Sequence, residues 1–415
     1  MRVPDGFLQF VYLRNLNNAK NSIAHIQEQI TTQNKINRPS DSPLGNARIM
    51  RLKQQIQSNE SFANNISNSI SMLDNSTLSM EGMQTEVQNV LLALTKMNNA
   101  TVNDDLSPFV ADIDAALNSI MDLANSKYNN QYSFSGTNST TKPFSFNADK
   151  TAVVINGDLG GDQKIRLSNN ILQKINITGK ELFLPVMAQS GNLDSGTAVG
   201  GVQSSTSKVY DADGNEYDMT VNYTKTAANT YDLSYEIKDS DSNIVSSQTV
   251  NDLVFDTTSG KLKSMDGSNP KDIKIEVQDK KINLVLDVNS MTEKSSASKF
   301  VNSLSQKADI FNTLLSIKEK LLNGEKPNAV QSQIVEDFNQ HVLNKLSEAG
   351  SISNRLSSSA DLLQNQKFEL LSLLSSENDV DMAKALVDLQ SAQYSLDTSY
   401  KISSIILPRS LLDYM

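Results

Sequence analysis

Two short acidic segments are the residues whose types and spacing come closest to a metal site. The first is Asp211-Ala212-Asp213-Gly214-Asn215-Glu216, which begins like a calcium-binding loop with oxygen ligands at alternate positions. Its glycine stands at position 4 rather than position 6, and no glutamate follows at position 12. The second, Asp239–Asn243, lacks both the glycine and the final glutamate. We therefore predict a hairpin turn at the first segment and a solvated turn at the second.

The other candidates for chemistry do not form a catalytic group. Gly157–Gly161 lacks the lysine and the strand–loop–helix setting of a phosphate loop. The chain has no cysteine, and its two histidines, His25 and His341, are far apart in sequence, which removes the commonest zinc ligand sets. No nucleophile–base–acid grouping emerges. The sequence thus predicts no catalytic residues, no cofactor, no metal and no enzymatic activity.

Length and charge narrow the class of protein further. At 415 residues the chain has room for about two or three domains. A net charge of −10 without a dense basic patch argues against nucleic-acid binding. No run approaches 18 apolar residues, so we expect no membrane insertion. The first 18 residues show no apolar core and no cleavage site of a conventional secretory signal.

The element that organises the chain is a predicted coiled-coil helix from Ser42 to about Asn99. Apolar residues recur there at spacings of 3 and 4: Leu52, Ile56, Ala63, Ile66, Ile70, Leu73, Thr77, Met80, Val87, Leu91 and Leu94. Ser42 followed by Pro43 is typical of a helix N-cap and first turn. Ser107-Pro108 repeats this pattern before a third helix that ends near Tyr128. We expect a further helix to start at about Asn328, and Asn378-Asp379 to cap a last one. Such long stripes need other helices to cover them.

Both ends of the chain carry matching seams that we predict to be assembly interfaces. These residues are Leu16, Ile23, Ile26 and Ile30 near the start, and Met382, Leu386, Leu389 and Leu396 near the end. The early seam stops before a turn that two prolines exclude from a helix: Asn37, Arg38, Pro39, Ser40, Asp41, Ser42 and Pro43. We predict that this turn sets the angle of the terminal helix and that Arg38 pairs with a carboxylate on a neighbouring subunit.

Between the helical ends lies a β-rich insertion. Of the 17 glycines, 12 lie between Gly136 and Gly267, which makes this stretch rich in turns. Residues 188–205 look like a linker, and Ser290 with Glu293 forms a capping box where helix is expected to resume. The fold class is then α+β and multidomain, an antiparallel coiled-coil rod built from both chain ends with inserted β domains. The predicted parts are an N-terminal assembly helix (1–40), half of the rod (41–145), a β region (146–190), a β domain (191–289), the other half of the rod (290–375) and a C-terminal assembly helix (376–415).

Three separated motifs resemble the flagellins and the flagellar hook-associated proteins. They are Gln29–Gln55, Asn130–Phe144, and the pair Glu377–Lys384 with the terminal Ser410–Met415. The Asn37–Pro43 turn has the form typical of the family of distal hook–filament junction proteins, although Ser42 stands where that family more often has Asp. Lys208–Lys225 with Phe255–Leu262 is similar to a β domain of flagellar hook proteins, which often have Trp at the place of Tyr231.

The resemblance implies a structural role in the bacterial flagellum. It implies export through the flagellar type III channel without a cleaved signal, an extracellular location at the hook–filament junction, and self-polymerisation. The implied partners are hook-associated protein 1, flagellin and a flagellar export chaperone. Two alternatives stay open: a flagellin-type filament subunit, and a coiled-coil surface fibre or adhesin, which would need an anchor or signal.

Overall fold

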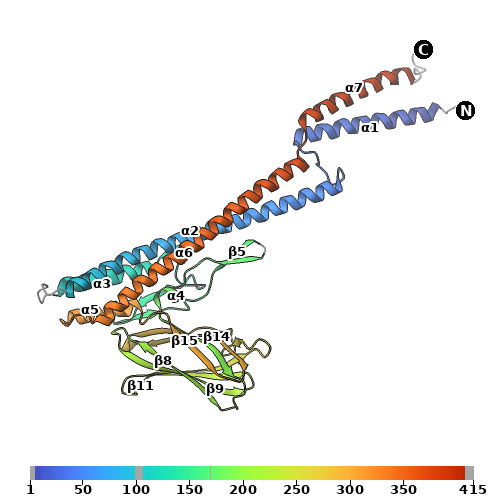
Figure 1. The fold of residues 1–415 in the computed structure, drawn as a ribbon. Coiled ribbons are helices and arrows are strands. Elements are labelled where there is room, and N and C mark those ends of the chain that lie inside the picture. The colour runs from blue at the N-terminus through green and yellow to red at the C-terminus, as the bar shows by residue number, and fades with distance from the viewer. Residues whose placement is uncertain (1–4, 99–105, 169, 407–415) are drawn as a thin grey trace. The chain divides into compact units, whose positions relative to one another are not determined.

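Helices at both ends of the chain flank a β-rich middle. The computed structural model describes residues 5–98, 106–168 and 170–406. Its helices are α1 (Asp5–Thr32), α2 (Pro43–Asn98), α3 (Ser107–Ala124), α4 (Gly179–Phe183), α5 (Ile310–Leu322), α6 (Ala329–Asn378) and α7 (Met382–Ile406) (Figure 1). This arrangement confirms the predicted α+β class with an insertion between helical ends. The predicted motif Ser410–Met415 lies outside the described residues.

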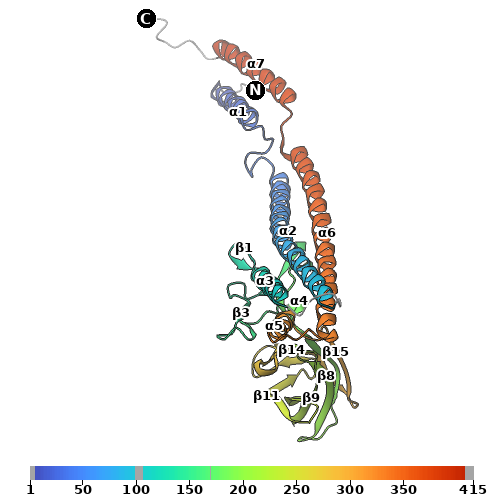
Figure 2. The ribbon, with the colours of Figure 1, turned by 90° about the vertical axis from the view of Figure 1, so that its left-hand side faces the viewer.

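The chain divides into two compact units, which we call the terminal unit (up to Asn65 and from Ser358) and the central unit (Ile66–Ser357). In the terminal unit α1 lies beside α7, as both views show (Figures 1 and 2). The Tyr12 hydroxyl donates to the carbonyl of Ser399 over 2.9 Å. The start of α2 pairs with the end of α6 through Arg48–Glu377, at 3.1 Å, and Glu60–Lys367, at 2.9 Å. Both helix pairs are therefore antiparallel.

The predicted seam of α2 is buried at six of its eleven positions and half-buried at the other five. Ile56, Ile66, Leu73, Met80, Val87 and Leu94 are buried along it. The helix begins as predicted, because the Ser42 Oγ accepts the amide N–H of Gly45 over 3.1 Å. In the central unit the buried face is wider than a two-residue seam, since Met83, Val90 and Ala93 are buried as well. A broader apolar face indicates packing by more than one neighbour there.

An aromatic cluster joins segments that are distant in sequence within the central unit. Phe144 lies 5.0 Å from Phe183 and 4.9 Å from Phe311, measured between ring centroids. Phe183 in turn stacks on Phe338 of α6 at 6.3 Å. All four side chains are buried. The cluster thus ties α4, α5 and α6 to strand β3 (Phe144–Phe146), each contributing one ring.

Small strand pairs connect α3 to this cluster. They are β1 (Lys127–Tyr128) with β2 (Gln131–Tyr132), β3 (Phe144–Phe146) with β4 (Val153–Ile155), and β5 (Lys164–Ser168) with β6 (Ile171–Lys174). Each pair is antiparallel. The Asn125 side chain joins the end of α3 to β3, because it accepts the amide N–H of Phe144 and donates to its carbonyl, both over 3.1 Å.

Residues 186–304 form a β domain of two sheets. One sheet has the order β12-β11-β10-β9-β8 and the other β13-β14-β7-β15. Their bounds are β7 (Val186–Asp194), β8 (Val202–Tyr210), β9 (Glu216–Ala227), β10 (Thr230–Lys238), β11 (Ile244–Phe255), β12 (Leu262–Ser264), β13 (Ile273–Val277), β14 (Ile282–Ser295) and β15 (Lys299–Leu304). One shared core lies between the sheets, with Tyr223, Leu233 and Leu286 fully buried. A parallel pairing of β7 with β14 joins strands that are about 100 residues apart in sequence.

Two predictions about this region were wrong. Residues 188–205 are not a linker, because most of them lie in β7 and β8. Helix does not resume at Ser290, which pairs with Ser190 inside the sheet. The Glu293 carboxylate, expected to cap a helix, instead accepts from Lys225 at 3.0 Å in the domain core. The returning helix begins at Ile310, where Asp309 accepts the amide N–H of Asn312 over 2.8 Å. A long-range sheet pairing has here overridden a local helix signal.

Three expected helix limits shift by a few residues. Leu106 rather than Ser107 is the N-cap of α3, which leaves Pro108 in the first turn. That helix ends at Ala124, and Lys127–Tyr128 form a strand instead. The cap of α7 is Asp381, whose carboxylate accepts the amide N–H of Lys384 over 3.0 Å, whereas Asn378 is still the last residue of α6. Asp381 carries the same carboxylate cap chemistry as the predicted Asp379.

Candidate assembly surface

The predicted turn at Asn37–Pro43 is organised by the Asp41 carboxylate. One of its oxygens accepts the amide N–H of Arg38 over 2.8 Å and that of Asn37 over 3.0 Å. The hydrogen bond from the Arg38 amide is the main reason that the pKa of Asp41 lies below its usual value. Asp41 therefore closes the turn on its N-terminal side, while Ser42 caps α2. The residue types that the sequence singled out form one compact turn.

Arg38 already has a carboxylate within its own chain. Its guanidinium lies 3.1 Å from a carboxylate oxygen of Glu28 on α1. Two thirds of the arginine side chain is exposed, and a pair this exposed contributes little to stability. The predicted intersubunit pairing of Arg38 would thus have to replace or share the contact with Glu28. Within the chain, the pair links the turn to the last part of α1.

The two segments that connect the terminal helices pair with each other, which sequence reasoning missed. The amide of Lys35 donates to the carbonyl of Asn378 over 2.6 Å, and that of Val380 donates to Gln33 over 3.1 Å. The side-chain amides of Asn34 and Asn378 are also hydrogen-bonded. These two backbone hydrogen bonds and the side-chain hydrogen bond fix how the two connecting segments align with each other. They therefore also fix the register in which α1 and α7 start to pair. In the sequence, the polar residues of the two connecting segments were the only sign of this pairing.

The predicted seam residues divide into two groups. Leu16, Ile23, Ile26, Ile30, Leu389 and Leu396 are half-buried along the contact of α1 with α7. Met382 and Leu386 are exposed. The structure therefore brings six of the eight into the helix pair of a single chain. Each of the six keeps part of its surface in water.

Further apolar side chains of the terminal unit face solvent and were not predicted. On α7, Val387 is 65% exposed and Tyr394 is 77% exposed. They are seven residues apart and so share one side of the helix. Phe10 and Leu13 of α1 are exposed as well. The hydrophobic residues of this unit that are buried, among those described, are Ile49, Ile56, Leu363 and Ala385. The terminal unit thus has a thin core and an apolar surface of the kind that marks interaction sites.

The two acidic segments are turns of the same design. Asp211 accepts from the amides of Asp213 (2.9 Å) and Asn215 (2.8 Å), from the Asn215 side chain (2.9 Å) and from the Tyr217 hydroxyl (3.0 Å). Asp239 accepts the corresponding backbone bonds in its own turn. Burial beside Asp211 raises the pKa of Tyr217 to about 12. These carboxylates are used within the turns, and within the described residues no cluster of three or more metal-ligand side chains is found.

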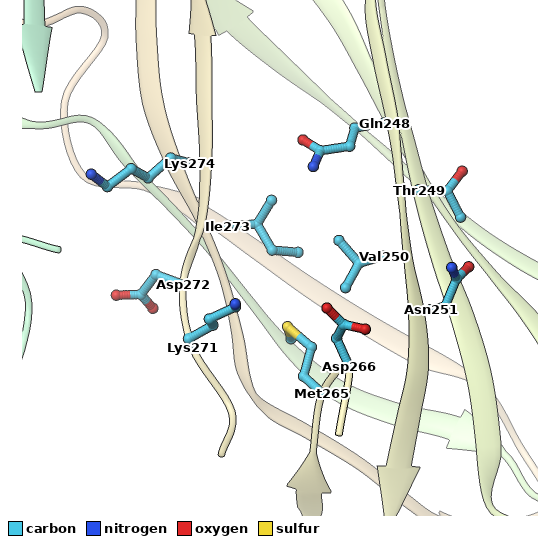
Figure 3. A pocket seen from close by; sticks show the side chains of 10 residues that line it. All are labelled: Gln248, Thr249, Val250, Asn251, Met265, Asp266, Lys271, Asp272, Ile273 and Lys274. Atoms are coloured by element: carbon cyan, nitrogen blue, oxygen red, sulfur yellow. The ribbon is translucent and has the colours of Figure 1, made fainter. Parts of the chain in front are cut away.

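A cleft of about 340 Å³ lies between β11 and the segment before β13 (Figure 3). Its floor holds Val250, Met265 and Ile273, and its rim carries Asp266 and Lys271 with their charged groups turned toward one another. The side chain of Asp272 points away from the cleft, where Lys180 binds it at 2.6 Å. One acidic and one basic group thus face the opening, so the cleft does not favour a ligand of one charge.

Comparison with known proteins identifies three regions of the chain. Residues 7–139 match the bacterial flagellin N-terminal helical region, and residues 332–415 match the bacterial flagellin C-terminal helical region. Residues 185–307 match the flagellar basal body protein FlaE D2 domain. This last match covers the β domain, whose resemblance to hook proteins was predicted. None of the helices in the described ranges has the length and apolar character of a membrane span.

Three individual proteins that are similar to this chain are flagellar proteins by name. Flagellar hook-associated protein 3 of Escherichia coli (strain K12) is 26% identical over 182 residues, which are 42% of this chain and 55% of the relative. The match thus spans about half the length of that relative. The solved hook-associated protein 3 of Legionella pneumophila is 20% identical, with a TM-score of 0.47 over 79% of this chain and 98% of that one. For FlgL of Xanthomonas campestris the identity is 18% and the TM-score 0.34, over 77% and 98%. The chain is thus similar to the bacterial flagellins over its two terminal regions, to the FlaE D2 domain between them, and to flagellar hook-associated protein 3.

Proposed function

We propose that this chain is a non-enzymatic structural subunit of the bacterial flagellum that polymerises at the hook–filament junction. Its neighbours there are hook-associated protein 1 on the hook side and flagellin on the filament side. It reaches this extracellular site through the flagellar export channel, escorted by an export chaperone and without a cleaved signal.

The observation that carries this proposal is the uncovered apolar surface on the paired helices of the terminal unit. Residues matched to both flagellin helical regions form the antiparallel pairs α1–α7 and α2–α6. Val387, Tyr394 and Phe10 leave apolar surface uncovered on them. Covering such a surface by a neighbour is favourable by about 25 cal/mol for each Å² removed from water. Subunits that each offer and cover such faces, in a head-to-tail manner, generate a helical or ring polymer.

The mode of association that we infer is helix against helix. An amphipathic helix that is half-covered in the monomer presents a groove into which a neighbouring helix can lay its apolar side. Leu386 and Met382 lie on α7 beside the seam that α1 covers, so they are placed to meet such a neighbour. The partly exposed seam residues Leu389 and Leu396 would be covered further in the polymer.

Deletion of the gene tests the place of the protein in the flagellum. We expect cells with intact hooks and no filaments, and flagellin released into the medium. Complete filaments in the deletion strain would instead establish a flagellin-type subunit that is one of several. Intact flagella together with loss of attachment to surfaces would favour an adhesin.

A second experiment tests the terminal surface itself. The double variant Val387→Ser/Tyr394→Ser should melt like the parent, because both side chains are already in water in the monomer. It should fail to restore filaments in the deletion strain. The matched control is Val199→Ser/Val202→Ser, which removes two exposed apolar side chains from the β domain. Equal complementation by both variants would show that the α7 surface is not an interface.

A further inference from the structure

The β domain enters and leaves the rest of the central unit through two adjacent connections. The chain enters at Val186 and leaves at Ser305. The amide of Val186 donates to the Ser305 Oγ over 2.9 Å, and the amide of Ser305 donates to the carbonyl of Val186 over 3.0 Å. Two covalent connections this close together act as one hinge, about which a domain can rotate unless other contacts prevent it.

The first such contact comes from the acidic turn between β8 and β9. Asp213 accepts from Lys320 over 2.9 Å and from Ser316, both on α5. The same carboxylate oxygen accepts from the Gln331 side chain of α6 over 3.0 Å. The backbone carbonyl of Asp213 accepts from the Asn328 side chain over 2.9 Å. One residue of the β domain is thus bound by four residues of α5, α6 and their connection.

The turn is shaped for this contact. Asp211 holds the amides of Asp213 and Asn215, which directs the Asp213 carboxylate out of the turn. Gly214 has φ +81°, and a Cβ at this position would lie 2.3 Å from the side chain of Val330 on α6. Burial alone would raise the pKa of Asp213, but the bonds from Ser316 and Lys320 lower it below its usual value. The carboxylate is therefore held in its charged form.

A second contact comes from the other sheet. Lys281, in the turn before β14, forms an ion pair with Glu319 of α5. The lysine side chain is mostly buried. Glu319 directly precedes Lys320, which binds Asp213. The five-stranded sheet therefore contacts α5 through Asp213, and the four-stranded sheet contacts it through Lys281. The charges are complementary in both places.

We infer that Asp213 and Lys281 are positioning residues that lock the β domain onto α5 and so fix its orientation relative to α6. Two adjacent chain connections leave one axis of rotation, and the contacts at two successive positions of α5 act against it. The ion pair of Lys180 on α4 with Asp272 of the β domain, at 2.6 Å, acts in the same sense. So does the hydrogen bond from the Asn283 side chain of β14 to the carbonyl of Val153, at 2.9 Å. Each ion pair is partly exposed and by itself adds little to stability. The role of the two ion pairs with α5 is to select an orientation, because both can form together only when the β domain lies in one orientation relative to α5.

Distance measurements between spin labels test this inference. The chain has no cysteine, so Ala228→Cys in the exposed β9–β10 turn and Ser347→Cys on the exposed side of α6 carry the only labels. In the otherwise unchanged chain we expect one narrow distance distribution. In Asp213→Ala/Lys281→Ala the distribution should become broad or shift. Lys208→Ala, which removes an exposed ion pair with Asp218 on the β domain, is the matched control and should leave it narrow.

A charge exchange separates orientation from folding. Lys281→Glu alone places two carboxylates against each other and should broaden the distribution, whereas Lys281→Glu with Glu319→Lys should narrow it again. Hydrogen exchange of β9 and β10 monitors the fold of the domain in every variant and should stay at the parent level. A distribution that is equally narrow in the parent, in Asp213→Ala/Lys281→Ala and in Lys281→Glu would overturn the inference. So would loss of β9–β10 protection in all of these variants, because the two residues would then maintain the fold rather than the orientation.

Discussion

The Nζ of Lys225 lies 3.0 Å from Glu293 Oε1 inside the β domain, where the two side chains are 8% and 1% exposed. The hydroxyl of Tyr231 donates to the same oxygen over 3.0 Å, and the amino group of Lys225 also donates to the carbonyl of Ser195 over 2.8 Å. Strands β9, β10 and β14 are joined by this cluster. It connects both sheets through groups that are each too polar to be buried alone.

Removing one partner of this pair should be far worse than removing both. Lys225→Met leaves the Glu293 carboxylate without its cation in the core, and we expect a loss of about 3–5 kcal/mol of stability. Lys225→Met with Glu293→Leu should cost much less, because no charge is left unpaired. Denaturant unfolding followed by tyrosine fluorescence measures both, since the chain has no tryptophan. Equal losses in the single and the double variant would contradict this view of the pair.

Asp309 should make stability depend on pH with an unusual sign. Its carboxyl group is fully buried at the start of α5, and burial raises its pKa to about 6 from an unfolded value near 3.8. The folded chain therefore retains a proton that the unfolded chain releases between these two values. Stability from this group rises as the pH falls through about 6 and is complete below about 4. The largest difference is about 3 kcal/mol.

The measurement compares the parent with Asp309→Asn, which cannot ionise. Unfolding free energies are taken at pH 4 and at pH 7.5 for both proteins, so that the other carboxylates cancel. The parent should gain stability relative to the variant at the lower pH. A constant difference at the two pH values would show that Asp309 does not titrate between them.

Two substitutions in the turn before α2 distinguish a role in stability from a role in assembly. Ser42→Ala removes the oxygen that caps the Gly45 amide and should cost about 1 kcal/mol. Arg38→Ala removes an exposed pair with Glu28 and should change stability by no more than ~0.5 kcal/mol. If Arg38 also binds a neighbouring subunit, its replacement should nevertheless weaken filament attachment and motility. Normal motility of Arg38→Ala would mean that the segment is only a turn.

The long helices could be predicted because their signal is repeated. Heptad spacing over many turns in α2 indicates the buried positions from Ile56 to Leu94. Asn328 and Ser42 indicate helix starts, because their side-chain oxygens accept backbone N–H groups of the first turn. The limits of such helices depend on one or two residues. That is why the caps of α3 and α7 shift while the helices themselves are as expected.

The errors in the β domain come from contacts that are distant in sequence. Gly191 looks like a linker glycine, but it lies in β7 at φ +136°, and a Cβ there would be 1.9 Å from the backbone oxygen of Lys299. The capping pattern at Ser290 is overridden because Glu293 meets Lys225, 68 residues away. The outward α7 residues Val387 and Tyr394 were missed for another reason. Heptad spacing of apolar residues indicates only the face of a helix that packs against a partner helix, and these two residues lie outside it.

The terminal helices should be the least protected part of an isolated monomer. α1 and α7 pair along one half-buried face, and in α7 the buried hydrophobic residue among those described is Ala385. Helices of this length have little stability without tertiary contacts, and local opening follows the density of buried contacts. Hydrogen exchange should therefore be fast in α1 and α7, slower in α3 and α5, and slowest in β9 and β10, whose inward side chains are buried. Polymerisation should slow exchange in α1 and α7 selectively. If a verified monomer protects these two helices as strongly as the β domain, their surface is already satisfied without neighbours, and assembly must rely on another face of the protein.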